Sequence, residues 1–187
     1  MTLGQASGQH AQPDDCVAAA LRDLLAATDH LRELLAGIAD LAVETIPACG
    51  SASITIIHDG TPATPASSDS RARQIDESQY VQGQGPCLRA ARTAEAVQVD
   101  DISTATQTGT WQNTAKLAYI TASLSMPLIT SANVDAALNL YTERESGWAS
   151  EVYEHAELLA THAGDAITVA YRLGHPDTGS AYWPYHP

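Results

Sequence analysis

Residues 119–141, YITASLSMPLITSANVDAALNLY, decide the fold. Apolar side chains recur at every second position of the first half: Ile120, Ala122, Leu124, Met126 and Leu128. This is the period of a strand with one buried face, so we predict a half-buried β-strand. The alternation resumes at Val134 after the polar, turn-forming residues 130–133. The stretch therefore predicts an antiparallel hairpin.

The second strand of this hairpin carries a different set of residues on its other face. Ala137, Asn139 and Tyr141 alternate with Ala136, Leu138 and Leu140. Their side chains are small or polar at the tip, which suits the wall of a pocket better than the middle of an apolar core. We therefore expect a binding site on this side of the sheet.

The length of the chain, 187 residues, predicts one domain. We expect a Gly-, Gln- and Ser-rich tail over residues 1–13, the domain over residues 14–173, and a Pro- and aromatic-rich tail over residues 174–187. The second tail contains Tyr182, Trp183, Tyr185 and His186, which could dock on a partner protein or stay disordered.

The charge of the chain excludes several classes of partner. The net charge is −13, from 22 acidic and 9 basic residues, and Lys116 is the only lysine. Such a surface does not favour direct binding to nucleic acid or to anionic membranes.

The sequence contains no apolar run of membrane-spanning length and its N-terminus does not resemble a signal peptide, so we expect a cytoplasmic protein. Three cysteines without a CxxC motif fit reduced thiols.

Two long amphipathic helices are predicted at the ends of the domain. The first runs from Asp14 to about Ile46, and the second from Ser150 or Ser146 to about Leu173. Apolar residues in both are spaced alternately by three and four, as in a helical seam, so we expect the helices to pack together and to form a homodimer. The candidate seam residues are Leu21, Leu24, Leu31, Leu35, Leu159 and Ala163.

Shorter elements fill the chain between these helices. We predict strands at 51–58, 63–68 and 97–102, with a tight turn at Asp59-Gly60. Pro65 places the second of these strands at a sheet edge. Residues 71–82 form a short helix or a loop, Pro86 begins a helix, and residues 110–118 form another. The fold class is α+β.

Several of these segments together resemble a known family. The residues are Gln79-Tyr80, Gly83, Gly85-Pro86-Cys87-Leu88, Val99-Asp100-Asp101-Ile102, Trp111, Ser125-Met126-Pro127-Leu128 and Ala137-Leu138-Asn139-Leu140-Tyr141. In order and spacing they are similar to the GAF domains of actinobacterial signalling proteins, over about residues 16–173.

The resemblance implies a PAS-related architecture. A central antiparallel sheet of five or six strands would carry the terminal helices on one face and a cap of loops and short helices on the other. Many such relatives carry an RNA-binding ANTAR module after the GAF domain, and we expect that module to be missing here. Cyclic nucleotide is not the expected ligand, because Asn139 is not followed by the family's nucleotide-binding residues and the chain contains no Phe.

Cys87 is the sharpest candidate for chemistry. Near a helix N-terminus it could be a redox sensor or nucleophile, as in the GAF-fold free methionine sulfoxide reductases, but a small buried residue is the favoured interpretation. Asp100 and Asp101 are adjacent on a predicted strand and point to opposite faces, so they do not form an acid–base pair. His155 and His162 lie two helical turns apart, which is too far to share a zinc ion. We therefore expect no catalytic residue, no metal and no cofactor.

The function we predict is that of a non-enzymatic sensory or interaction domain in signal transduction. A small molecule would bind between the sheet and the cap, and a signalling protein would be a further partner. The candidate pocket residues are Tyr80, Cys87, Trp111, Asn139 and Tyr141. The alternative is a thiol-dependent reductase of the free methionine sulfoxide type.

Overall fold

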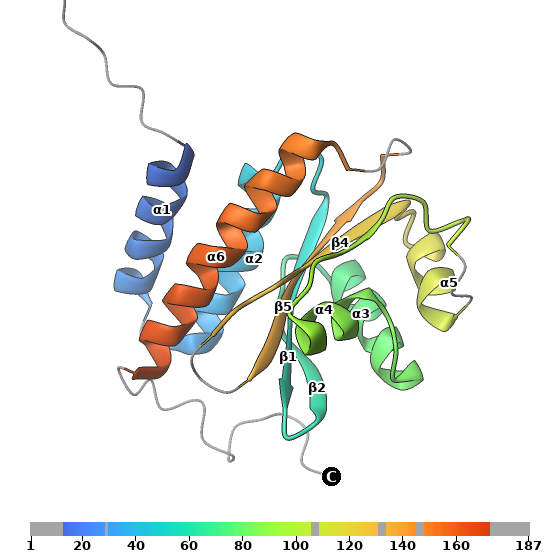
Figure 1. Ribbon diagram of the computed structural model, residues 1–187, viewed down its shortest axis with the longest axis horizontal. Coiled ribbons are helices and arrows are strands. Elements are labelled where there is room, and N and C mark those ends of the chain that lie inside the picture. The colour runs from blue at the N-terminus through green and yellow to red at the C-terminus, as the bar shows by residue number, and fades with distance from the viewer. Residues whose placement is uncertain (1–12, 29, 106–108, 131–133, 145–147, 173–187) are drawn as a thin grey trace, which may run out of the picture.

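The computed structural model describes residues 13–28, 30–105, 109–130, 134–144 and 148–172. A mixed α/β domain of three layers is formed, with a central sheet between two groups of helices (Figure 1). Its elements, in order, are α1 (Pro13–Ala27), α2 (Leu31–Thr45), β1 (Ser51–His58), β2 (Thr61–Ser67), α3 (Ser70–Gln82), α4 (Pro86–Thr93), β3 (Val97–Val99), α5 (Thr110–Leu117), β4 (Ala122–Pro127), β5 (Asp135–Thr142) and α6 (Ser150–Arg172). The two predicted tails, apart from Pro13, lie outside the described residues.

The sheet has five strands in the order β2-β1-β5-β4-β3, and every neighbouring pair is antiparallel. The predicted hairpin is confirmed as β4 and β5, in which Ser125 lies opposite Asn139. Asp59 and Gly60 both have positive φ, at 49° and 78°, as the tight turn between β1 and β2 requires. β2 is an edge strand, as Pro65 predicted.

One face of the sheet is covered by α2 and α6, and α1 packs outside them against α6 (Figure 1). The main core lies here, between the apolar faces of these helices and residues such as Ile54, Leu124 and Leu138 of the strands. The predicted packing of the first and last helical segments is confirmed.

The prediction of one helix from Asp14 to Ile46 is wrong. The chain instead forms α1 and α2, and the backbone of His30 between them is extended, with φ −128° and ψ 136°. Thr28 donates a side-chain hydrogen bond to Leu24 O, which satisfies a carbonyl of the last turn of α1. This break separates α1 from the helix that leads into the sheet.

The six seam candidates lie inside the subunit's own packing. Leu21, Leu31, Leu35, Leu159 and Ala163 are all buried, and Leu24 is half-buried against the core. A Cβ added to Gly37 of α2 would overlap the side chain of Leu24, which shows how closely α1 approaches α2. The apolar stripe that predicted a dimer seam is therefore used within the subunit, and a dimer would need a different surface.

The opposite face of the sheet is covered by α3 and α4, and α5 packs against α3. As a result β4 is buried on both sides, and the prediction of a half-buried strand is wrong: Ser123 and Ser125 are as inaccessible as Leu124. Small polar residues on a strand can face a second packed layer as well as solvent.

The predicted strand at 97–102 is shortened to Val97–Val99, because the chain turns at Asp101, whose carboxylate accepts a hydrogen bond from Ser103 N at 2.7 Å.

Candidate functional site

The junction between α3 and α4 is built around one buried glutamine. Gln79 of α3 accepts a hydrogen bond from Cys87 N at 2.9 Å through its Oε1, and so satisfies an amide that the first turn of α4 leaves unpaired. Gly85, with φ +155°, lies directly against this side chain, and a Cβ there would overlap Gln79 Oε1. Pro86 occupies the first turn of α4, where its missing N–H costs nothing.

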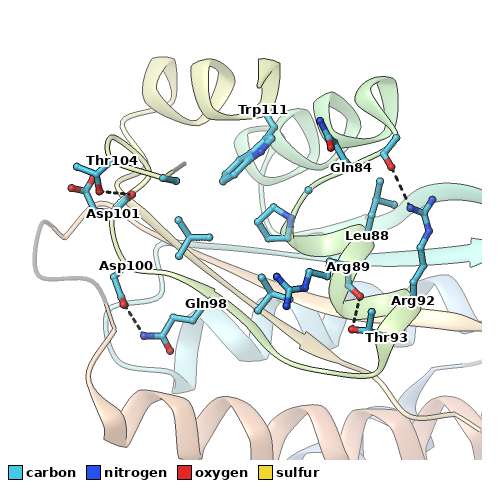
Figure 2. Close-up of a pocket in the computed structure, with 16 residues that line it drawn as sticks. Gln84, Leu88, Arg89, Arg92, Thr93, Gln98, Asp100, Asp101, Thr104 and Trp111 are labelled. Carbon is cyan, nitrogen blue, oxygen red and sulfur yellow. Dashed lines mark hydrogen bonds between the residues drawn. The ribbon is translucent and has the colours of Figure 1, made fainter. Parts of the chain in front are cut away.

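A cleft of about 660 Å³ opens beside this junction (Figure 2). Its walls are the start and one face of α4, strand β3, the turn that follows β3 and the beginning of α5. The apolar part of the lining comes from Pro86, Leu88, Val97, Val99 and Trp111. A cleft of this size with apolar walls and a few charged groups is typical of small-molecule sites.

Charged groups of opposite sign line different sides of this cleft. Arg89 and Arg92 project from α4, while Asp100 and Asp101 lie across from them in the turn after β3 (Figure 2). Asp101 is fully exposed, and hydrogen bonds from Ser103 lower the pKa of its carboxyl. It is therefore ionised at neutral pH.

A second polar group lies deeper, between α3 and the sheet. The carboxylate of Asp76 is fully buried and accepts hydrogen bonds from Ser53 Oγ at 2.6 Å, Thr64 Oγ1 at 3.2 Å, Asn139 Nδ2 at 3.3 Å and the hydroxyl of Tyr141. Burial raises the pKa of Asp76 to about 6, although these four donors act in the opposite direction. We call these five residues the Asp76 network.

Tyr80 extends the polar layer at its edge. Its hydroxyl lies 2.9 Å from Thr55 Oγ1 and 2.7 Å from Thr64 Oγ1. Asn139 also donates to Thr55 Oγ1 at 2.9 Å, while its own Oδ1 has no hydrogen-bond partner among the described residues. The sheet face on which we expected a pocket is filled by these side chains.

Of the five predicted pocket residues, the structure places one in the wall of the cleft. Trp111 lines the cleft, whereas Asn139 and Tyr141 belong to the Asp76 network and Tyr80 borders that network. Cys87 lies in the first turn of α4, and its side chain packs into the interior beside Ile57 and Ala137. The other four residues do not line the cleft: Cys87, Asn139 and Tyr141 are buried, and Tyr80 is half-buried.

The thiols of Cys87 and Cys49 are both inaccessible. Cys87 is 0% exposed, and burial raises its pKa well above the ordinary value. Burial also raises the pKa of Cys49 to about 12, and its Sγ donates to Ser51 O at 3.4 Å. Both thiols are protonated at neutral pH, which favours the interpretation of Cys87 as a buried packing residue. Cys16 is exposed on α1.

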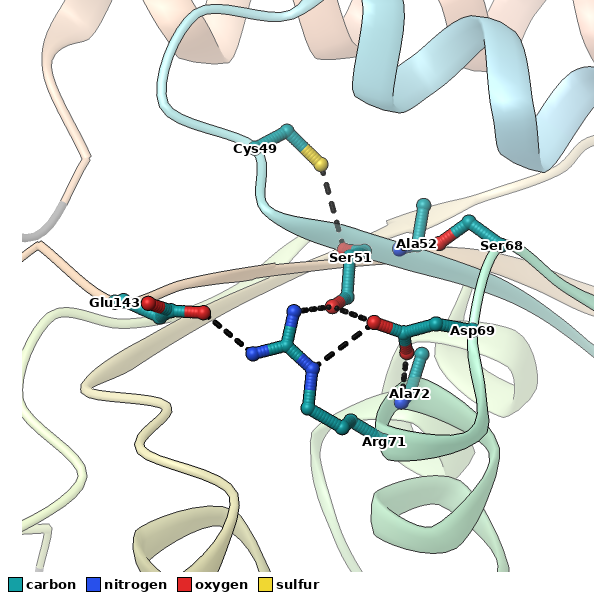
Figure 3. Close-up of polar contacts among 8 residues, drawn as sticks. All are labelled: Cys49, Ser51, Ala52, Ser68, Asp69, Arg71, Ala72 and Glu143. Atoms are coloured by element: carbon teal, nitrogen blue, oxygen red, sulfur yellow. Dashed lines mark hydrogen bonds and ion pairs between the residues drawn. The ribbon is translucent and has the colours of Figure 1, made fainter.

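A polar cluster ties three segments together at one edge of the sheet (Figure 3). Arg71, at the start of α3, donates to Asp69 Oδ2 and to Ser51 Oγ, each at 3.0 Å, and forms an ion pair with Glu143. Ser51 begins β1, and Glu143 directly follows β5. Asp69 also caps α3, accepting from Ala72 N at 2.9 Å. The cluster holds the start of α3 against the central strands.

Comparison with known families identifies the architecture. The family model described as the GAF domain matches residues 28–168, which is most of the chain. The chain belongs to the GAF domain family. No curated protein matches it.

Solved structures show the same fold at low sequence identity. The GAF domain of a phosphoenolpyruvate-protein phosphotransferase from Coxiella burnetii is 16% identical with a TM-score of 0.66, covering 89% of this chain and 99% of that one. A GAF protein from Burkholderia vietnamiensis, proposed to be a sensor, is 15% identical with a TM-score of 0.63, covering 91% and 99%. The free methionine-R-sulfoxide reductase from Neisseria meningitidis, solved with its substrate, is 13% identical with a TM-score of 0.64, covering 92% and 98%.

Sequence reasoning missed three important residues of this GAF domain. In the sequence, Gln79 stands out only as part of the family resemblance, and Asp76 and Arg89 belong to none of the segments that carry it. The signal for Asp76 is weak, because it lies in RARQIDESQYVQ, a segment that looks exposed. Arg89, Arg92 and Thr93 are spaced as one face of a helix, which could have indicated a polar lining.

Two further observations concern the described part of this GAF domain. None of its helices combines the length and apolar character that a bilayer-spanning segment needs. Across the same residues, no three His, Cys, Asp or Glu side chains come together in a way that could hold a metal ion.

Proposed function

We propose that this GAF domain is a non-enzymatic sensory module that binds a small molecule in the cleft between α4, β3 and the start of α5. The observation that carries the proposal is the cleft itself, with about 660 Å³ of space, an apolar wall ending at Trp111 and charged side chains at its sides. A GAF protein from Burkholderia vietnamiensis that is proposed to be a sensor is among the structures it resembles, which agrees with a sensory role.

The arrangement of the cleft also suggests how binding would be communicated. Gln79 and Gly85 join the first turn of α4 to α3, and α3 contacts the sheet through Asp76. A ligand that contacts α4 would therefore bias the position of α3 relative to the central strands. Such coupling requires two arrangements of similar free energy, one of which the ligand favours.

The proposal is tested by native mass spectrometry of the protein purified from its own host. Thr93→Trp places an indole on the exposed, cleft-facing side of α4 and should abolish a retained ligand mass. Thr61→Trp is the matched control, since Thr61 is also exposed but begins the edge strand β2. An adduct that survives in Thr93→Trp would place the ligand elsewhere, and no adduct in any sample would count against a sensor.

The finer assignment is a cytoplasmic signalling protein related to the GAF domains of actinobacterial GAF-ANTAR proteins. Its support is the set of sequence blocks from Gln79-Tyr80 to Tyr141 and the acidic, lysine-poor composition. A homodimer and a signalling protein partner are further parts of the proposal. Sedimentation equilibrium tests the dimer, which would have to use a surface other than the buried seam candidates.

The alternative is a reductase of the free methionine sulfoxide type, and its support is the similarity in fold to such enzymes. The burial of Cys87 and Cys49 weighs against it, because thiol chemistry needs an accessible thiolate. Turnover of free methionine sulfoxide by the wild type, lost in Cys87→Ser, would favour the enzyme over the sensor.

A further inference from the structure

The two basic residues of the cleft come from one face of one helix. Arg89 and Arg92 are three residues apart on α4, and Thr93 completes the same face at the next position. The whole chain has only 9 Lys and Arg residues against 22 Asp and Glu. Two cations lining one cleft are therefore a local departure from a strongly acidic surface.

The two arginines differ in what they contact. Arg92 turns to the rim of the cleft and donates to Gly83 O at 3.2 Å, whereas Arg89 points from α4 toward β3 (Figure 2). Among the described residues, the Arg89 guanidinium has no hydrogen bond or ion pair. Its N–H groups are therefore free to donate two parallel hydrogen bonds to an anionic group of a ligand, in the geometry that arginine forms with carboxylates.

The two carboxylates on the acidic side of the cleft already accept hydrogen bonds from neighbouring residues. Asp100 accepts from Gln98 Nε2 at 2.6 Å, and Asp101 accepts from Ser103 N at 2.7 Å and from Ser103 Oγ. These carboxylates do not need a cationic ligand group to satisfy them. They do repel a second negative charge placed in the cleft, and the repulsion is modest because both are exposed.

Part of the remaining lining is apolar, and the cleft, at about 660 Å³, has room for a ring. Leu88, Val97, Val99 and Trp111 line the cleft. Trp111 is 2% exposed and packs in a core cluster with Ala72 and Ile75, so it closes the end of the cleft. Val97 and Val99 are half-buried and keep accessible surface in the cleft. An apolar wall of this kind favours an apolar body in the ligand.

We infer that the ligand is a monoanionic carboxylate on an apolar, ring-sized body, with the carboxylate on Arg89 and the body against Val97 and Val99. This inference rests on the proposed function and names the chemical class that the cleft would take. Phosphate monoesters and nucleotides fit less well, because they bring at least one more negative charge toward Asp100 and Asp101.

The test is isothermal titration calorimetry of the full chain at pH 7.5 with three probes that share a naphthyl ring: 1-naphthylacetate, its neutral and isosteric amide 1-naphthylacetamide, and 1-naphthyl phosphate. We expect the carboxylate to bind about tenfold more tightly than the amide, which corresponds to about 1.4 kcal/mol. Arg89→Ala should remove this difference, whereas Arg32→Ala, an exposed arginine on α2 across the sheet, should leave it unchanged. Asp101→Asn should tighten carboxylate binding, an effect that a purely structural role would not produce.

The possible outcomes separate the ligand class from the proposed cleft. Equal binding of acid and amide, or an unchanged preference in Arg89→Ala, overturns the carboxylate inference while ligand binding in the cleft stands. Tighter binding of the phosphate also overturns it. If no probe binds but wild-type protein from its host retains a mass that Thr93→Trp loses, the class is wrong and the sensor proposal survives. If neither is seen, both fail.

Discussion

Replacing Tyr141 with phenylalanine removes one hydroxyl from a site where its loss should be measurable and pH-dependent. The Tyr141 side chain is 1% exposed and its hydroxyl donates to Asp76, whose other hydrogen bonds come from Ser53, Thr64 and Asn139. Hydrogen bonds to charged groups contribute about 1.5–3 kcal/mol, and those to neutral groups about 0.5–1.5 kcal/mol. We expect Tyr141→Phe to lower the free energy of unfolding by about 2 kcal/mol at pH 7.5.

The sign of the pH dependence follows from the pKa of Asp76. Because its folded-state pKa, about 6, lies above the ordinary 3.8, the native state binds the proton more tightly than the unfolded state does. The stability from this residue is therefore fully present below pH 3.8 and is lost as the pH rises through 6, by about 3 kcal/mol. Without the Tyr141 hydroxyl as donor, the pKa of Asp76 rises further. The free energy of unfolding of the variant therefore falls more than that of the wild type between acid and neutral pH. At pH 5 the difference between the two should shrink to about 1 kcal/mol.

Urea unfolding followed by circular dichroism at pH 5.0 and 7.5 measures the difference in free energy of unfolding between the wild type and Tyr141→Phe. The contributions of other titrating groups are the same in both proteins and cancel in this difference. Tyr153→Phe is the matched control, because Tyr153 is half-buried on α6 and its hydroxyl has no hydrogen bond to any other described residue. A loss of stability that is the same at both pH values would refute the assignment of Asp76 as the group that titrates. No loss at either pH would refute the network itself.

Three further outcomes are expected. Gly85→Ala should lower the free energy of unfolding, measured in urea, by about 2–3 kcal/mol, because the new Cβ displaces Gln79 from its capping position and the positive φ adds strain. The control Gly83→Ala, at φ +69° with open space around it, should lower it by about 1 kcal/mol. Equal losses in the two variants would contradict this packing argument. Iodoacetamide should modify one thiol per native chain, that of Cys16, as read by mass spectrometry, and rapid modification of a second thiol would show that a buried cysteine is accessible. Arg71→Ala should lower the free energy of unfolding in urea by about 1 kcal/mol, and this loss should diminish in 1 M salt, because the ion pairs of Arg71 are partly exposed. A larger loss that does not change with salt would mean that the packing of the Arg71 side chain dominates.

Local sequence signals predicted most of the fold. The period-two alternation from Ile120 to Leu140 identified the β4–β5 hairpin, and the Asp59-Gly60 turn fixed the β1–β2 hairpin. Pro86 correctly marked the first turn of α4. Each of these features depends on residues close together in the chain, where steric and hydrogen-bonding preferences act directly.

The interior of the candidate site was not predictable in the same way. Asp76 looks like part of a solvated helical face, and only its contacts with residues of β1, β2 and β5 show that it is buried. Likewise Ser123 and Ser125 look like the exposed face of a strand until α4 covers them. The burial of a polar group is decided by segments distant in sequence, so local periodicity cannot reveal it.

The strand order also has a consequence for synthesis on the ribosome. β1 is an interior strand, yet its partner β5 begins only at Asp135, long after β1 ends at His58. At translation rates of about 5–20 residues per second, the nascent chain must carry an unpaired edge of SASITIIH for roughly 4–15 seconds. During that interval the emerging β1–β2 hairpin offers an open template to other chains, and the arrival of β5 closes it.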